Sequence, residues 1–154
     1  MKGGFIHRRG TEDAEFAQSE VTERVLAAAF EVHTVLGAGL LESIYQRALA
    51  RELHLRGVRF EQQVAIPLAY KGATLDAPLR LDLLVEGAVI VEIKSVLHLD
   101  QIHQAQVLTY LRLADLRVGL LINFNVPSLR QGIKRVINIP RTSASSVPLR
   151  CMNS

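Results

Sequence analysis

The sequence predicts an α/β domain in which helices pack around a mixed β-sheet. Apolar residues recur at helical spacing up to about residue 56, and they alternate at strand spacing in the segment that follows. Two almost continuously apolar runs come next, at 88–95 and 118–122, with a helical segment between them. Such runs belong to strands that are covered on both faces. A strand, a helix and a second strand at this spacing form a right-handed crossover with parallel strands.

Length and composition indicate one globular domain. The chain has 154 residues, of which 49% are hydrophobic and 21% are charged, as is ordinary for a globular protein. We expect no membrane span, since no apolar run approaches the roughly 20 residues that one needs, and no secretory signal at the N-terminus. The single cysteine, Cys151, can form no internal disulfide, and we therefore expect a cytoplasmic protein.

The net charge of +3 is compatible with a polyanionic partner but does not require one. Dedicated nucleic-acid-binding proteins usually concentrate basic residues far more heavily. Charge therefore leaves the class of partner open.

Both ends of the chain lack periodicity. Residues 1–18 contain Gly3, Gly4 and Gly10 among charged residues, and we expect a flexible N-terminal arm. Residues 141–154 are rich in serine, and we expect a disordered C-terminal tail. The domain is predicted to span residues 19–140.

Two helices are expected at the start of this domain. Ser19 is a suitable N-cap for the first helix, which has apolar residues at helical spacing up to Leu36. Gly37 and Gly39 end that helix. The second helix is predicted over residues 41–56 and ends at Gly57.

The remaining elements follow from alternation, from turn residues and from the apolar runs. Pro67 places the strand at 64–70 at a sheet edge, because proline cannot donate to a ladder. A turn at Lys71-Gly72 leads to a second strand. The predicted segments are strands at 64–70, 75–85 and 88–95, a helix at 100–114, and strands at 118–122 and 136–139. The expected order is α, α, β, β, β, α, β, β.

Glu92 and Lys94 lie in the buried strand at 88–95, where charge is unexpected. They are two residues apart, so both side chains point to one face of the sheet. A buried charge without a partner is costly, and such charges are normally paired or gathered around an ion.

The register of the hairpin places a second carboxylate beside them. Pairing Leu81, Leu83 and Val85 with Ile93, Val91 and Val89 keeps the apolar residues of both strands on one face. This register puts Asp82 opposite Glu92, with their Cβ atoms about 5 Å apart. Two converging carboxylates repel each other unless a cation lies between them. Hard oxygen ligands suit Mg²⁺ or Mn²⁺. The alternative is a solvated strand face on which Arg80 and Lys94 neutralise the carboxylates.

Three motifs carry a resemblance to a known superfamily. Asp82, nine intervening residues and Glu92-Ile93-Lys94 resemble the PD-(D/E)XK nuclease signature, with Leu81 where the superfamily name has proline. The segment Gly39–Tyr45 resembles the motif that names the GxxExxY protein family. The segment Gln106–Tyr110 resembles the QxxxY helix motif of RecB-like nucleases. The resemblance covers about residues 21–139 and implies a restriction-endonuclease-like core.

The resemblance also implies roles for these residues. Asp82, Glu92 and the backbone carbonyl of Ile93 would bind Mg²⁺ or Mn²⁺, and Glu42 would be a further or water-mediated ligand. Lys94 would orient or deprotonate the attacking water, or stabilise charge on the phosphate. A Glu in the first turn of a helix is also favoured by the helix dipole alone.

The predicted helix at 100–114 contributes a second polar group. Gln106 and Tyr110 share one face and would hold Lys94, Glu92 or a substrate phosphate. Because no His or Cys at zinc-ligand spacing accompanies them, His98 and His103 are expected to be ordinary polar residues. Tyr45 is expected to pack and to fix the helix that carries Glu42.

Three functions remain open from the sequence. The leading one is a Mg²⁺-dependent nuclease that hydrolyses phosphodiester bonds in DNA or, second, RNA. Another is a catalytically silent nuclease-fold module that binds nucleic acid or protein, within a complex or as a homodimer. The third is a hydrolase of small molecules that uses Asp82 and Glu92 without a metal.

Overall fold

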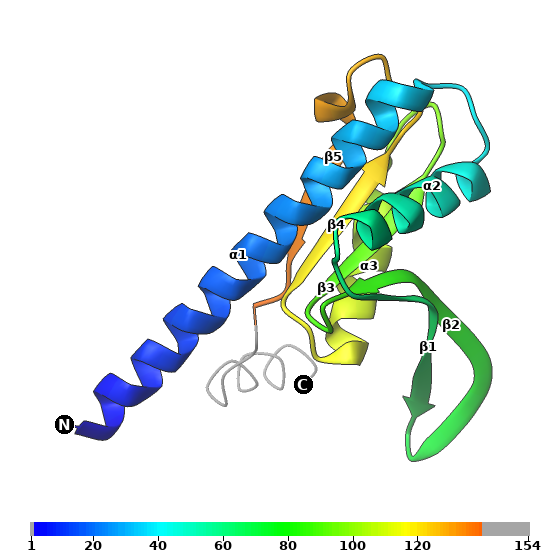
Figure 1. Cartoon of the computed structure of the whole chain (residues 1–154). Coiled ribbons are helices and arrows are strands. Elements are labelled where there is room, and N and C mark those ends of the chain that lie inside the picture. Colours follow the sequence, from blue (N-terminus) through cyan, green and yellow to red (C-terminus); the bar gives the residue numbers. More distant parts are fainter. Residues whose placement is uncertain (1, 140–154) are drawn as a thin grey trace.

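One mixed sheet organises the part of the chain that the structure describes. The computed structural model describes residues 2–139, with side chains for residues 12–76 and 79–139. Five strands lie in the order β1-β2-β3-β4-β5 (Figure 1). Their bounds are β1 (Phe60–Tyr70), β2 (Ala73–Val85), β3 (Val89–Lys94), β4 (Val118–Asn123) and β5 (Ile133–Ile137). β3 and β4 are parallel, and the other neighbouring pairs are antiparallel.

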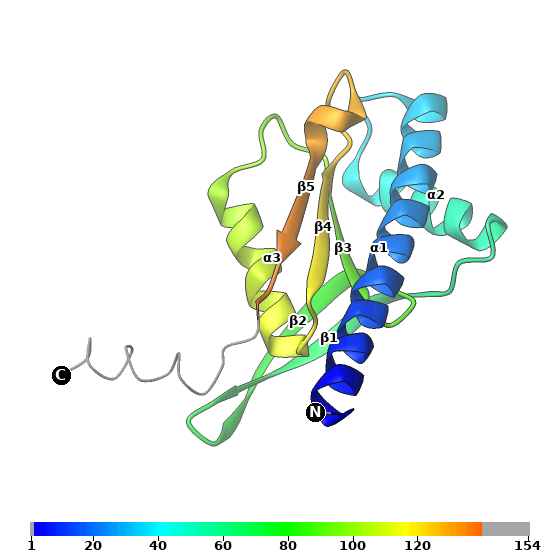
Figure 2. The same ribbon diagram turned by 90° about the vertical axis from the view of Figure 1, so that its left-hand side faces the viewer.

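Helices cover both faces of this sheet. The helices are α1 (Lys2–Leu36), α2 (Glu42–Leu55) and α3 (Gln101–Ala114), and a short 3-10 helix, η1 (Leu129–Gly132), precedes β5. α1 and α2 lie on one face, and α3 lies on the other (Figure 2). Apart from η1, the predicted order of helices and strands is confirmed.

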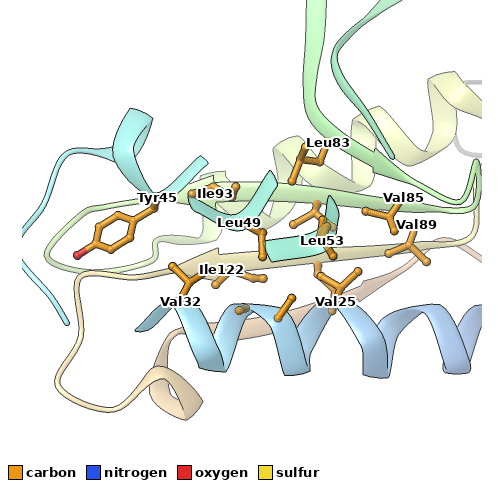
Figure 3. Close-up of a cluster of buried hydrophobic side chains, with 14 of the residues drawn as sticks. Val25, Val32, Tyr45, Leu49, Leu53, Leu83, Val85, Val89, Ile93 and Ile122 are labelled. Atoms are coloured by element: carbon orange, nitrogen blue, oxygen red, sulfur yellow. The ribbon is translucent and has the colours of Figure 1, made fainter. Parts of the chain in front are cut away.

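Two hydrophobic clusters hold the layers together. On one face, Tyr45 and Leu49 of α2 and Val25 of α1 lie in one cluster with Val89 and Ile93 of β3 (Figure 3). On the other face, side chains of α3 pack against the sheet; this cluster includes Ile90, Val107, Tyr110, Leu111 and Leu121. Alternate residues of β3 thus enter opposite clusters, which explains why this strand is apolar throughout.

The edge position predicted for β1 is confirmed. Pro67 lies in this outermost strand, and the register with β2 shifts between Ile66 and Leu68, on either side of the proline. Lys71 and Gly72 both have positive φ angles, of 48° and 83°. Two such residues form a tight turn between antiparallel strands, which agrees with the predicted turn.

The prediction that the first helix begins at Ser19 was wrong. α1 begins at Lys2, and the Thr22 hydroxyl donates a hydrogen bond of 2.8 Å to the carbonyl of Gln18, within the helix. The Arg117 guanidinium donates to Glu15 over 2.8 Å, which ties this part of α1 to the start of β4. A tertiary contact therefore supports a helix that local pattern did not predict. The proposed domain limits of 19 and 140 stay a prediction.

The last strand begins earlier than predicted. β5 pairs with β4 from Ile133 opposite Ile122 to Ile137 opposite Val118, so the strand includes Lys134 and Arg135, which obscure its apolar pattern. The predicted tail at 141–154, including Cys151, lies outside the described residues. Among the helices described, none has the length and apolar character that crossing a membrane requires.

Candidate active site

The two predicted carboxylates meet where β2 and β3 separate. The ladder joins Val85 to Val89 and Leu83 to Val91, as predicted, and within the described residues it goes no further. Beyond it, the Asp82 backbone N–H donates to Glu92 Oε1 over 3.0 Å. The Ile93 backbone N–H donates to Asp82 Oδ2 over 2.9 Å. Side-chain oxygens thus take the place of backbone carbonyls as acceptors at this point.

This separation corrects one part of the predicted register. Two expected ladder pairs, Leu81 with Ile93 and Asp82 with Glu92, are not formed among the described residues. The two acids are near each other through their side-chain hydrogen bonds instead. Leu81 packs in the cluster on the α3 face, whereas Ile93 packs in the cluster beneath α1 and α2. Because the pairing of β2 with β3 ends at Leu83, the residues before Leu83 need not share a face with those of β3.

Glu92 is a buried carboxyl group beside a second acid. It is 3% exposed, and burial, followed by the charge of Asp82, raises its pKa to about 8. Lys94 opposes this rise. The ion pairs of the described residues lie elsewhere, at Arg56–Glu52, Arg59–Glu86 and Arg117–Glu15. The predicted alternative, in which Arg80 and Lys94 neutralise these acids through salt bridges, is therefore not formed.

Lys94 is the last residue of β3 and is partly buried. Its backbone pairs with Asn123 of β4, and its carbonyl accepts a hydrogen bond of 3.0 Å from the Phe124 N–H. Because Lys94 is two residues after Glu92, its side chain leaves the sheet on the same face. The ammonium group and the two carboxylates therefore face one region at the carboxyl end of β3.

Glu42 approaches this region from α2. It is the first residue of that helix. Burial raises its pKa most, the charges of Lys94 and His103 lower it, and the charge of Asp82 raises it. Glu42 therefore lies within electrostatic range of the other charged residues, although no hydrogen bond joins it to them among those described.

Tyr45 fixes the loop that leads to Glu42. Its hydroxyl donates to the Gly37 carbonyl over 2.6 Å and accepts the Leu40 N–H over 3.2 Å. Its ring is fully buried and stacks on Phe124 with a centroid distance of 4.7 Å. The expectation that Tyr45 packs and fixes the helix that carries Glu42 is confirmed. In addition, its hydroxyl binds two backbone groups of the loop before that helix.

Gln106 and Tyr110 reach the same region from α3. The Gln106 Nε2 donates to the Tyr110 hydroxyl over 2.8 Å. Burial, followed by the charge of Glu92, raises the pKa of Tyr110, and the charge of Asp82 adds to this rise. His103 has a local role, because its Nδ1 accepts the Asp100 N–H over 3.0 Å in a capping box at the start of α3.

Comparison with known proteins assigns the family. The profile of the PD-(D/E)XK nuclease superfamily matches residues 19–136, which include Glu42, Asp82, Glu92 and Lys94. This chain belongs to that superfamily. Its mixed sheet flanked by helices is consistent with a restriction-endonuclease-like fold, and the superfamily suggests a nuclease-like function that acts on nucleic acid.

Other comparisons add less. A solved structure titled "Crystal structure of SSO0001" is similar, with a TM-score of 0.49 and 19% sequence identity over 90% of this chain and 67% of that one. Comparison with curated proteins finds no match.

Members of the PD-(D/E)XK superfamily typically use divalent metal ions, and the donor atoms of this chain fit such an ion. Asp82 and Glu92 supply hard oxygen donors. The Ile93 N–H points toward Asp82, and the carbonyl of a strand residue points to the same side as its N–H. No group of three or more His, Cys, Asp or Glu side chains with metal-binding geometry occurs in the described part of the chain. Two carboxylates with water and phosphate as further ligands are typical of Mg²⁺.

Sequence reasoning missed the residues that hold the chain after Lys94. The Ser95 hydroxyl donates to the Leu40 carbonyl over 2.6 Å, and Asn123 is a buried polar residue, 1% exposed. An asparagine at the end of the apolar run 118–122 was the available signal. Beside this segment lies an open hollow of about 600 Å³, which is lined by residues that include Ser95, His98, His103 and Asn125.

Proposed function

We propose that this protein is a Mg²⁺- or Mn²⁺-dependent nuclease that hydrolyses phosphodiester bonds, with DNA as the preferred polymer and RNA as the second. The observation that carries this proposal is the convergence of Asp82 with the buried Glu92, and among the described residues no Lys or Arg forms a salt bridge with either acid. A cation bound there would offset the repulsion that raises the pKa of Glu92.

Asp82, Glu92 and the Ile93 carbonyl would hold the ion, and Glu42 would contact it through water. When bound, a divalent ion polarises a phosphoryl oxygen and makes water more acidic. The Lys94 ammonium donates to a phosphate oxygen as negative charge develops there. Glu42, whose carboxyl has a raised pKa, orients the attacking water or accepts its proton.

Tyr110 has an orienting function in this proposal. Its oxygen already accepts the Gln106 amide, so its own proton is free to donate elsewhere. The charges of Glu92 and Asp82 both raise the pKa of Tyr110, after the larger effect of burial. Tyr110 therefore donates to Glu92 or to the substrate phosphate, and Gln106 holds its hydroxyl in place.

We also propose membership of the GxxExxY family. Gly39, Glu42 and Tyr45 match the three fixed positions of its motif. Gly39 has a φ angle of 96°, which favours glycine, and Tyr45 holds the loop ahead of Glu42. A cytoplasmic location and a homodimer or partner protein remain proposals of the same kind.

A second candidate is a nuclease-fold module that binds nucleic acid or protein without hydrolysis. The observation in its favour is that Asp82 and Glu92 each accept a backbone hydrogen bond. These bonds stabilise the hairpin without any ion. A purely structural role could therefore account for the presence of both acids.

Cleavage of a substrate panel separates the two candidates. The panel contains single- and double-stranded DNA and RNA with Mg²⁺ or Mn²⁺, and the variants are Asp82→Ala and Lys94→Ala. Matched controls are Asp76→Ala on the same strand and Lys134→Ala on β5, both exposed. The nuclease proposal expects cleavage by wild type and by both controls, with loss in both site variants and with a chelator. Equal weak cleavage by all proteins would indicate a contaminant and favour the binding module.

A further inference from the structure

Asn123 is the most buried polar side chain near the candidate active site, and the function proposed above gives it no role. It is 1% exposed and ends β4. A buried amide is costly unless its donor and acceptor atoms are paired. The groups that form hydrogen bonds with the Asn123 amide therefore indicate its role.

Those partners belong to the chain that follows Lys94. The Val96 N–H donates to Asn123 Oδ1 over 3.0 Å, and Asn123 Nδ2 donates to the Val96 carbonyl over 2.9 Å. Asn123 Oδ1 also accepts the Asn125 N–H over 3.2 Å. One side chain thus binds both backbone groups of a residue 27 positions earlier, as a neighbouring strand would.

The ladder between β3 and β4 ends just before Val96. Lys94 and Asn123 are the last paired residues of β3 and β4, and the Phe124 N–H bond to Lys94 follows them. Paired residues of neighbouring strands project to the same face, so Asn123 and Lys94 emerge from the sheet side by side. The Asn123 amide therefore continues the pairing for one further residue beyond Lys94.

A second bond holds the same segment from the opposite direction. The Ser95 hydroxyl donates to the Leu40 carbonyl, in the loop that the Tyr45 hydroxyl also holds. Lys94 is therefore followed by two consecutive residues that are each fixed to a different element. A segment fixed in this way keeps the backbone of Lys94 in one position.

We propose that Asn123 is a positioning residue for Lys94, one that sets where the lysine ammonium lies relative to Asp82 and Glu92. The inference rests on the nuclease function proposed above for its effect on rate, but its effect on Lys94 can be measured without cleavage. Asn123 itself contacts neither substrate nor ion in this proposal. Its loss should lower kcat and leave the binding of the divalent ion unchanged.

The kinetic experiment compares Asn123→Ala with Asn138→Ala. Asn138 is the control, because its side-chain amide also donates to a backbone carbonyl, that of Leu116, over 3.0 Å. Leu116 precedes β4, so this bond lies at the opposite end of the strand from Asn123. A purely structural role would lower the stability of Asn123→Ala but leave kcat of the folded variant at the value of wild type and of Asn138→Ala. We expect kcat to fall about 10- to 100-fold only in Asn123→Ala, since small misplacement of a reacting group can have this effect. KM and the Kd for Ca²⁺ should change by less than about 3-fold, because Asn123 contacts neither substrate nor ion.

A second measurement reads the position of Lys94 directly. Lysine occurs only at Lys2, Lys71, Lys94 and Lys134, so lysine-selective ¹³C labelling gives few NMR signals. The order parameter of the Lys94 side chain should fall in Asn123→Ala, and it should stay unchanged in Asn138→Ala. If the alanine variant misfolds, Asn123→Asp supplies a variant of the same size. Its carboxylate can still accept the Val96 N–H but cannot donate to the Val96 carbonyl. We expect kcat and the Lys94 order parameter to fall by an intermediate amount.

The outcomes separate the inference from the proposed function. Cleavage by wild type with equal rates for the Asn123 and Asn138 variants would overturn the positioning role and leave the nuclease proposal standing. Absence of cleavage by wild type, together with a disordered Lys94 in Asn123→Ala, would overturn the nuclease proposal and support the positioning role. An unchanged Lys94 order parameter would overturn the inference whatever the activity.

Discussion

Asp82 and Glu92 each accept a hydrogen bond from the backbone of the strand that carries the other. The two bonds, of 3.0 Å and 2.9 Å, replace ladder bonds where β2 and β3 separate. The charges of the two acids repel each other, and these bonds hold the acids close together in spite of that repulsion. The hairpin therefore holds the acids in place, and the consequences can be measured as stability, titration and ion binding.

Glu92 should make the metal-free protein less stable at high pH. A glutamate ionises near 4.5 in the unfolded chain, and the pKa of Glu92 is raised to about 8 in the native state. Between these values unfolding releases a proton, so a rise in pH favours the unfolded state. The contribution of Glu92 is fully present below pH 4.5 and is lost as the pH rises through 8. Glu92→Gln, which cannot ionise, should be more stable than wild type at pH 8 by about 1–3 kcal/mol, and the difference should vanish at pH 4.5.

Urea unfolding at the two pH values measures this difference. Glu61→Gln is the control, because Glu61 is exposed on β1 and should change stability by at most about 0.5 kcal/mol at either pH. A Glu92→Gln variant that is less stable than wild type at pH 8 would contradict the prediction.

A divalent cation should stabilise the protein, and more so at pH 8.5 than at pH 6. The ion binds the ionised carboxylates, so binding competes with the proton on Glu92. A concentration of about 100 times Kd adds about 2.7 kcal/mol, or a rise in Tm of roughly 5–10 °C for a domain of this size. Thermal unfolding with Ca²⁺ or Mg²⁺ measures the shift. Asp82→Ala should abolish it and Asp76→Ala should keep it; an equal shift in both variants would show that the ion binds elsewhere.

Tyr45→Phe should loosen the loop that leads to Glu42. The change removes only the hydroxyl, which bonds Gly37 and Leu40, and keeps the stacking on Phe124. We expect a loss of about 1–2 kcal/mol in the free energy of unfolding, because two backbone groups lose their partner. Chemical denaturation measures this loss. Tyr70→Phe is the control, since Tyr70 is 61% exposed on β1, and a similar loss there would mean that the Tyr45 hydroxyl has no special role.

Gly132→Ala should be more harmful than Gly119→Ala. A Cβ atom at position 132 would overlap the backbone carbonyl oxygen of Asn123, which the end of β4 holds in place. A Cβ at position 119 would lie 2.7 Å from Val107 Cγ1, a side-chain atom that can move. We expect losses of about 3 kcal/mol for Gly132→Ala and about 1 kcal/mol for Gly119→Ala in thermal unfolding. The reverse order would show that η1 moves more easily than α3.

The core of the candidate site followed from local pattern. Two-residue periodicity placed Glu92 and Lys94 on one face of β3, and the apolar register predicted that Asp82 lies near Glu92. The acids are near each other, although the ladder itself ends one pair earlier, at Leu83. These relationships lie within one hairpin, where the residues involved are near in sequence and side-chain burial fixes the pairing. The register failed at Leu81 because the ladder between β2 and β3 ends at Leu83, and alternation of apolar residues does not indicate where two strands separate.

The residues that fix the site from outside the hairpin were decided by the tertiary structure. Asn123 reaches Val96 across 27 residues and Ser95 reaches Leu40 across 55, and no local pattern specifies such pairs. The start of α1 is a similar case, because Glu15 meets Arg117 only after the chain has folded. Sequence by itself determined the order of helices and strands and the pair of acids, since periodicity and burial act over a few residues. Only the tertiary structure decided where α1 begins and which side chains fix the segment after Lys94, because those contacts join elements that lie far apart in the sequence.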